Sequence, residues 1–256
     1  MCICCSEVIL SIPSLQIDVS GSMNSNTTSA GSEECGLCIL DIVKHAARTI
    51  IATLNENDRL SVVTFSNNAT VVFGLMVMNS IGKSNANSLL DQLEADGMTN
   101  LWDGLHTGLE ILKHRTEEDG VYIRANAAVL LLTDGTPNIE PPRGNLKMLT
   151  KYKESSGGKF PGIISTFGFG YILDSTLLRK IATDGGGMYA FIPDSGFVGT
   201  IFVNSLSTIL CTVTADAELS LRVDPESNAR CGDLELCILF VYICWYFLLC
   251  NVFDFR

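Results

Sequence analysis

An apolar run near the middle of the chain limits the folds that the protein can adopt. Residues 127–133 read Ala-Ala-Val-Leu-Leu-Leu-Thr, without a charged residue, a glycine or a proline. A run of this length indicates a strand that is buried on both faces, as in a parallel sheet. It ends at Asp134-Gly135, where the chain is expected to turn. The sequence therefore predicts a sheet with parallel central strands.

Strand and helix patterns alternate on both sides of this run. Strands are predicted over 14–19, 59–66, 70–78, 127–133, 162–169 and 188–192, and helices over 37–54, 83–93, 101–113, 146–154, 173–182 and 197–210. Asn67-Asn68 joins the second and third strands as an antiparallel hairpin. The first strand is expected to begin after Pro13, because proline donates no ladder hydrogen bond. The alternation predicts an α/β fold with a doubly wound, mostly parallel central sheet, helices on both faces and one antiparallel edge strand.

Five oxygen-bearing side chains stand in loops that should meet at one edge of this sheet: Asp18, Ser20 and Ser22 after the first strand, Thr99 before a helix, and Asp134 after the most buried strand. In an open α/β sheet, ligands gather beyond the carboxyl ends of the strands, where the strand order reverses. Two carboxylates and three hydroxyls are oxygen ligands of the kind that Mg2+ prefers. Each residue alone is equally suited to capping a turn or a helix. Their convergence favours a cation site.

The same three loops resemble the metal-ion-dependent adhesion site of von Willebrand factor A (VWA) domains. The matching segments occur in the order of that family: Asp18-Val19-Ser20-Gly21-Ser22, Gly97-Met98-Thr99-Asn100 and Leu132-Thr133-Asp134-Gly135. Segments from Ile163 to Gly170 and from Ile181 to Gly187 are similar to later core elements of intracellular-type members. The resemblance covers roughly residues 14–212.

The resemblance implies a Rossmann-like sheet with a bound Mg2+ or Mn2+. Ser20, Ser22 and Thr99 would contact the metal directly or nearly so, and Asp18 and Asp134 would act largely through water. An open position would accept an acidic group from a protein ligand, because hydroxyl ligands neutralise a cation incompletely. The implied function is a metal-dependent protein-binding module for adhesion or scaffolding.

Catalytic motifs are each broken at a required residue, which disfavours an enzyme. No G-x-S-x-G nucleophile elbow is present. Gly82-Lys83-Ser84 resembles the end of a phosphate-binding loop, but Val77 stands where the first glycine is needed. Phosphoryl transfer of the haloacid type would need a second aspartate in place of Ser20. No catalytic residue is therefore predicted.

The net charge and the placement of the cysteines limit the partners, disulfides and metal sites that the sequence supports. The net charge of -11 argues against a nucleic-acid partner. The ten cysteines crowd towards the two ends of the chain, which is not the even spread of a disulfide framework. Cys35 and Cys38 have the spacing of half a zinc site, but no second pair with ligand spacing follows.

The chain divides into four predicted segments: a cysteine-rich lead-in over 1–13, the VWA-like domain over 14–212, a short strand or linker segment over 213–235, and a hydrophobic tail over 236–253. The tail approaches the length that spans a bilayer, so it is a candidate transmembrane helix. A buried helix and an aberrant end are the alternatives.

The start of the chain lacks the basic region of a secretory signal, which favours an intracellular protein. Two further readings of the function stay open. One is a membrane-tethered adhesion or receptor fragment that uses the same site through the tail. The other is a scaffold module of a ubiquitin-ligase-like protein, which rests on family analogy alone.

Overall fold

The computed structural model describes residues 10–25, 37–118, 126–134, 136–171, 173–193 and 198–211. All of them belong to one compact unit that extends from Met1 to Thr214. The predicted segments over 213–235 and 236–253 lie outside the described residues. Within the described ranges, no helix is both long enough and apolar enough to cross a membrane.

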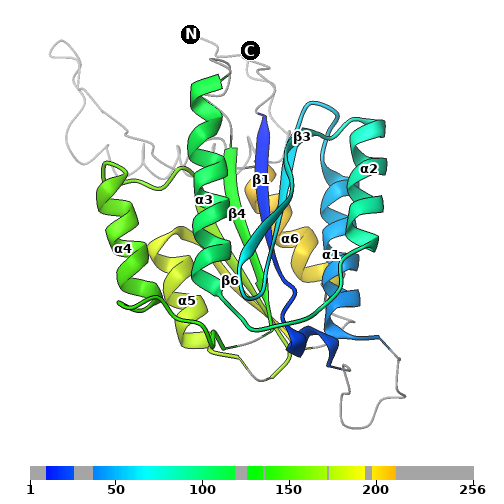
Figure 1. Ribbon diagram of the computed structural model, residues 1–256. Coiled ribbons are helices and arrows are strands. Elements are labelled where there is room, and N and C mark those ends of the chain that lie inside the picture. Colours follow the sequence, from blue (N-terminus) through cyan, green and yellow to red (C-terminus); the bar gives the residue numbers. More distant parts are fainter. Residues whose placement is uncertain are drawn as a thin grey trace, which may run out of the picture. The chain divides into compact units, whose positions relative to one another are not determined.

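A six-stranded sheet forms the centre of the domain (Figure 1), in the order β3-β2-β1-β4-β5-β6. Its strands are β1 (Ser11–Asp18), β2 (Arg59–Phe65), β3 (Ala69–Val77), β4 (Asn126–Thr133), β5 (Ile163–Phe169) and β6 (Gly186–Ile192). All neighbouring strands are parallel except β3, which runs antiparallel to β2 at one edge. This confirms the predicted doubly wound, mostly parallel sheet with one antiparallel edge strand.

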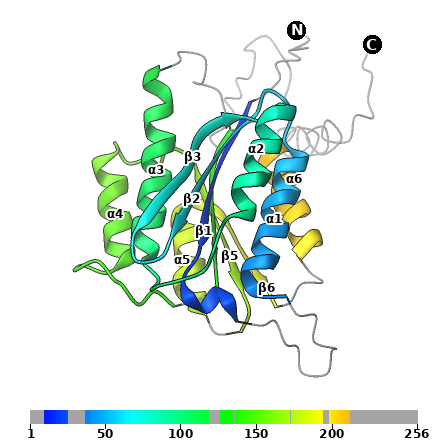
Figure 2. The ribbon, with the colours of Figure 1, turned by 45° about the vertical axis from the view of Figure 1, so that its right-hand side comes forward.

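Helices cover both faces of the sheet, as Figure 2 shows. The first face carries α1 (Ile39–Thr53), α2 (Ser80–Asp91) and α6 (Val198–Cys211), and the second carries α3 (Leu101–Glu118), α4 (Asn145–Ser155) and α5 (Ser175–Asp184). In β4, Leu130 and Leu132 belong to the core under the first face, and Val129 and Leu131 to the core under the second. Successive side chains of a strand point to opposite faces. The apolar run is therefore buried on both sides, as predicted.

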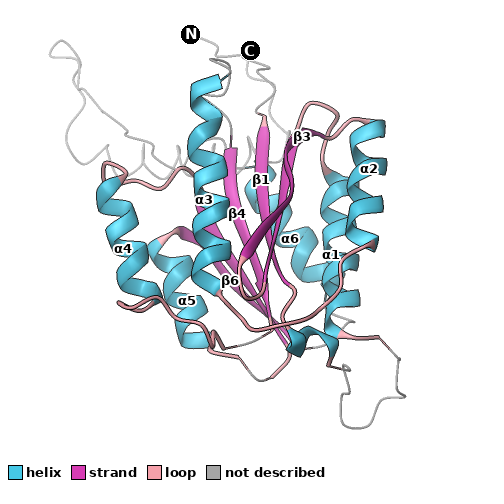
Figure 3. Cartoon of the chain, viewed as in Figure 1, coloured by secondary structure: helices cyan, strands magenta, loops and turns pink. Residues whose placement is uncertain are grey.

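Each predicted strand and helix is present (Figure 3), and the differences lie at the element ends. One of them is the start of α2, which begins at Ser80 although the helical pattern predicted a start at Lys83. The Gly82 N–H donates to Asn79 Oδ1 at 2.9 Å, so Asn79 caps the helix. This cap starts the helix one turn before its apolar pattern becomes regular.

The expectation that the first strand begins after Pro13 is wrong, because β1 begins at Ser11 and includes the proline. Pro13 aligns with Ala128 of β4, whereas pairing with β2 starts only at Ser14. The Ser11 N–H points to the β2 side and donates to Asp58 Oδ1 at 2.9 Å. Because N–H groups alternate between the two neighbours of a strand, the N–H that Pro13 lacks would point to the same side. The missing N–H therefore falls where the pairing of β1 with β2 has not yet begun.

Two glycines one turn apart bring α3 close to the sheet. A Cβ atom on Gly104 would lie 2.5 Å from the ring of Phe65, and one on Gly108 would lie 2.1 Å from the side-chain nitrogen of Gln16. Larger residues would force the helix away from β1 and β2. The close packing fixes the start of α3 relative to β1, and Thr99 lies just before that start.

Candidate cation site

The strand order reverses between β1 and β4, which are neighbours at the centre of the sheet. The chain adds β2 and β3 on one side of this point and β5 and β6 on the other. Asp18 is the last residue of β1, and Asp134 directly follows β4. Both carboxylates therefore stand beyond the carboxyl ends of adjacent parallel strands, at the position where α/β sheets bind ligands.

A continuous chain of hydrogen bonds joins four of the five predicted residues. The Ser20 N–H donates to Asp18 Oδ1 at 2.8 Å. The hydroxyl oxygens of Ser20 and Ser22 are 3.1 Å apart, and the Ser22 hydroxyl donates to Asp134 Oδ1 at 2.9 Å. The Thr133 hydroxyl donates to the other carboxylate oxygen of Asp18 at 2.5 Å. The first and third predicted loops therefore meet in one cluster.

The two serines lie at the start of a 3-10 turn, η1 (Gly21–Asn24), that follows β1: Ser20 directly precedes the turn and Ser22 lies within it. The Met23 N–H donates to Ser20 O at 3.0 Å and closes the turn. The Met23 side chain is fully buried in the core under α1. This anchor holds the turn against the sheet, with Ser20 buried and Ser22 exposed.

Backbone hydrogen bonds tie the loop before α3 to the end of β1. The Asp96 N–H donates to Val19 O at 2.8 Å, and the Gly21 N–H donates to Gly97 O at 3.0 Å. Gly97 has a φ of +84°, a conformation that favours glycine. The second predicted loop, which carries Thr99, is therefore held beside the first.

Asn138 joins the Thr99 loop to the loop after β4. The Thr99 N–H donates to Asn138 Oδ1 at 2.6 Å, and the Asn138 N–H donates to Thr99 O at 3.2 Å. Thr99 is buried, yet within the described residues its hydroxyl makes no hydrogen bond with the other four site residues. Thr99 is thus held through its backbone beside the cluster, and its hydroxyl is not part of the hydrogen-bonded chain that joins the other four predicted residues.

Sequence patterns did not predict the roles of the residues that hold these loops. Asn67 was predicted only as part of a hairpin turn, yet its Oδ1 accepts the Met98 N–H at 2.9 Å. The Asn100 side-chain amide in turn donates to Asn67 O at 3.1 Å. Thr133 and Asn138 have the corresponding roles for Asp18 and Thr99. Each of these contacts joins residues far apart in the chain, so local sequence patterns do not reveal them.

Two carboxylates are buried in the cluster without a positive side chain. Asp18 is fully buried and Asp134 is 6% exposed, and neither has an ion-pair partner in the part of the chain that the structure describes. Burial, together with the nearby charge of Asp18, raises the pKa of Asp134 to about 6. Burial also raises the pKa of Asp18, against the hydrogen bonds from Ser20 and Thr133. A divalent cation would supply the missing positive charge, so the donor set fits a hard cation.

A structural zinc site with Cys and His ligands fits the described residues less well than a site for a hard cation. Within the described ranges, no group of three or more His, Cys, Asp or Glu side chains is placed to hold a metal. Cys38 is a free thiol at the start of α1, where it donates to Asp41 Oδ2 at 3.1 Å. Cys35 lies outside the described residues. The candidate site therefore depends on hydroxyl groups, unlike the Cys and His sites typical of structural zinc.

The fold and the cluster together define a doubly wound α/β domain with carboxylates and hydroxyls gathered at the switch point of its sheet. Residues 15–136 match the family described as von Willebrand factor type A domain, and this range includes all five site residues. The chain belongs to the von Willebrand factor type A domain family.

The chain spans only part of the relatives that it matches. It is 31% identical over 172 residues to human inter-alpha-trypsin inhibitor heavy chain H3, a match that covers 67% of this chain and 18% of that protein. It is 26% identical over 213 residues to the uncharacterized protein YfbK of Escherichia coli (strain K12), covering 82% of this chain and 33% of that protein.

Solved structures share the fold. A von Willebrand factor type A protein from Catenulispora acidiphila aligns with a TM-score of 0.64 and 23% identity, over 79% of this chain and 43% of that one. Proximal thread matrix protein 1 from the mussel byssus aligns with a TM-score of 0.56 and 20% identity, over 79% of this chain and 46% of that one. That structure was solved with zinc in its MIDAS motif, the metal-ion-dependent adhesion site. At these identities the likeness concerns the fold alone.

Proposed function

We propose that this domain binds Mg2+ or Mn2+ through Asp18, Ser20, Ser22, Thr99 and Asp134, and that the bound cation captures a carboxylate of a protein ligand. The observation that carries the proposal is the hydrogen-bonded cluster that links the two buried carboxylates through the two serines. The cluster gathers oxygen ligands at the switch point and contains no positive side chain to balance them.

The residues of the cluster would have distinct roles. Asp18 and Asp134 supply negative charge, and the three hydroxyl groups supply neutral oxygen ligands. The direct ligands would be neutral hydroxyl groups, and the two carboxylates would act largely through water, so the bound ion would still attract a further carboxylate. Thr133 and Asn138 act as positioning residues, because they bind Asp18 and the Thr99 backbone.

The cluster supports binding better than catalysis. A nucleophilic serine is most often activated by an adjacent histidine. His45 lies on α1 and His106 and His114 lie on α3, and none of them hydrogen-bonds to Ser20 or Ser22. His106 instead packs against the rings of neighbouring aromatic residues. The membrane-tethered and ubiquitin-ligase-like alternatives would use the same cluster, and no feature of the described residues favours either.

The proposal is tested by titrating the full chain with Mn2+ and following the electron paramagnetic resonance signal of the free ion. Saturable binding that EDTA reverses is expected. Loss of an outer-shell partner typically costs about 10–100-fold in metal affinity, so Asp134→Asn should weaken binding by at least about tenfold. Thr99→Ala removes a proposed direct ligand and should weaken binding at least as much. Glu140→Gln is the matched control, because it removes an exposed carboxylate from the same loop as Asp134; it should leave the Mn2+ affinity unchanged. Undiminished binding by Asp134→Asn would contradict the proposal.

A further inference from the structure

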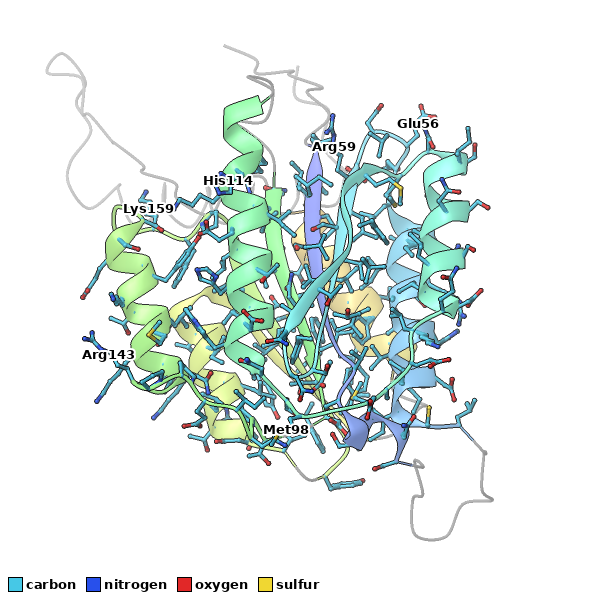
Figure 4. The ribbon with its side chains drawn as sticks, in the orientation of Figure 1. Glu56, Arg59, Met98, His114, Arg143 and Lys159 are labelled. Carbon is cyan, nitrogen blue, oxygen red and sulfur yellow. The ribbon has the colours of Figure 1, made fainter. Side chains whose placement is uncertain are left out.

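Large apolar side chains are exposed beside the candidate cation site. Met98 directly precedes Thr99 and is 46% exposed, Tyr171 follows β5 and is 73% exposed, and Phe191 near the end of β6 is 39% exposed. None of these three belongs to either apolar core. Figure 4 shows Met98 at the lower end of the domain, where the loop before α3 passes the end of the sheet. The fold thus leaves three large apolar groups in contact with solvent at this edge.

The topology places these residues on opposite sides of the site. Along the sheet, β4 is followed by β5 and then by β6. Neighbouring strands are about 4.8 Å apart, so the end of β5, which Tyr171 follows, lies roughly one strand spacing from the end of β4, which Asp134 follows. The loop that carries Met98 crosses the other side, where Gly97 O accepts the Gly21 N–H. The site therefore lies between Met98 and the pair formed by Tyr171 and Phe191.

The fold also holds these residues in place. The rings of Tyr171 and Phe191 meet edge to face, with their centroids 5.8 Å apart. The Met98 N–H is bound by the Asn67 side chain, which fixes the backbone from which the methionine projects. Residues that are ordered before binding lose less conformational entropy when a partner arrives.

The chemistry of the side chains around the site favours one class of ligand. Exposed apolar patches mark interaction surfaces, and methionine and aromatic residues are enriched in interfaces. The two site carboxylates offset the charge of a divalent cation, so the loaded site has little net negative charge that would attract basic groups of a ligand. Charged flanks on the ligand would be buried against these side chains at a cost. Apolar flanks would gain burial and exclude water from the contact between cation and carboxylate, which strengthens that contact.

We propose that Met98, Tyr171 and Phe191 form an apolar rim around the cation site, and that the ligand is a protein segment in which an Asp or Glu is flanked by apolar side chains. This inference rests on the proposed cation-dependent function and names the class of ligand for the same site.

The test is a selection of displayed peptides that carry a fixed Glu between random residues. The peptides are selected on the immobilised full chain in Mg2+ and eluted with EDTA, so that only cation-dependent binders are recovered. The eluted pool is expected to be enriched in aliphatic and aromatic residues next to the Glu. Replacing this Glu with Gln in a selected peptide should abolish its binding.

Substitutions in the rim separate its effect from that of the cation. Met98→Ser and Tyr171→Ser should each lower the affinity for a selected peptide by about tenfold, because each removes a large apolar contact. Their Mn2+ affinities should equal that of the wild type. Ile81→Ser is the matched control, because Ile81 is 69% exposed. It lies shortly after β3, at the end of the sheet opposite to the cation site, where Val77 pairs with Arg59, the first residue of β2. The substitution should leave peptide binding unchanged.

Two results would contradict the proposal that these residues form a ligand-binding rim. One is an EDTA-eluted pool whose flanking residues match the unselected library, and the other is the lack of any such pool although Mn2+ binds. A protein that fails to bind Mn2+ would overturn the proposed function first, and the rim with it. The Mn2+ titration therefore tells the two failures apart.

Discussion

At the scale of single residues, Asp134 has a charge that the metal-free domain does not balance. It is buried beside Asp18, and its pKa is raised to about 6. A carboxyl group with a raised pKa binds its proton more tightly in the folded state than in the unfolded chain. Its contribution to stability is therefore fully present under acid conditions, and is lost as the pH rises from about 4 through about 6. At neutral pH, the site costs stability unless a cation is bound.

Asp134→Asn is therefore expected to stabilise the metal-free protein at neutral pH. The asparagine keeps an oxygen that accepts the Ser22 hydroxyl, but it carries no charge. One unit of pKa difference corresponds to about 1.4 kcal/mol, so the gain is at most on the order of 3 kcal/mol. In thermal unfolding with EDTA, the variant should melt about 5–10 °C above the wild type at neutral pH.

The pH and the metal provide the controls for this comparison. The difference between the two proteins should shrink near pH 4, where Asp134 of the folded wild type is protonated. Added Mg2+ should raise the melting temperature of the wild type more than that of the variant. A variant that melts below the wild type in EDTA at neutral pH would show that the buried charge is not destabilising.

The five site residues could be named from the sequence because they stand at predicted strand and helix ends. Their partners could not be named. Thr133 lies 115 residues from Asp18, and Asn138 lies 39 residues from Thr99. Such roles depend on which loops become neighbours, and no local pattern records that. The structure joins four of the five residues by hydrogen bonds and holds the Thr99 loop beside them, and their binding of a cation stays a prediction.

At the scale of elements, the site consists of three loops that the ends of β1, α3 and β4 hold together. Asn138 is the link between two of these loops, because its side chain and its backbone both bind Thr99. The position of the Thr99 hydroxyl is thus coupled to the loop that begins at Asp134.

Asn138→Ala is expected to lower Mn2+ affinity although Asn138 is not a predicted ligand. The substitution leaves the buried Thr99 N–H without its acceptor, at a cost of about 1–3 kcal/mol, and loosens the loop. Outer-shell losses of this kind typically reduce metal affinity by about 10–100-fold. Asn138→Asp retains an acceptor oxygen and should recover most of the affinity. Equal affinities for the wild type and Asn138→Ala would mean that the link does not position Thr99.

Sequence patterns predicted the strands and helices well and their ends less well. Apolar periodicity extends through an element, whereas an end depends on a single contact. Asn79 starts α2 early through its side-chain cap. Pro13 lies inside β1 because the side on which it lacks an N–H is not yet paired with β2. Neither contact changes the periodicity of the sequence.

At the scale of the whole molecule, the alternation of strands and helices was sufficient to predict the class of fold. The strand order was not predicted, because it depends on which distant strands become neighbours. That order decides the site, since it brings the ends of β1 and β4 side by side. The predictions for residues 213–235 and 236–253 concern segments outside the described residues and stay predictions.

Anomalous X-ray diffraction at the manganese edge, from crystals of the full chain grown with Mn2+, tests the cation site most directly. An anomalous peak is expected within direct coordination distance of the Ser20, Ser22 and Thr99 hydroxyl oxygens, and Asp134→Asn should abolish or strongly reduce it. A map in which the wild-type protein binds Mn2+ only elsewhere, or not at all, would contradict the assignment of these five residues as one metal site.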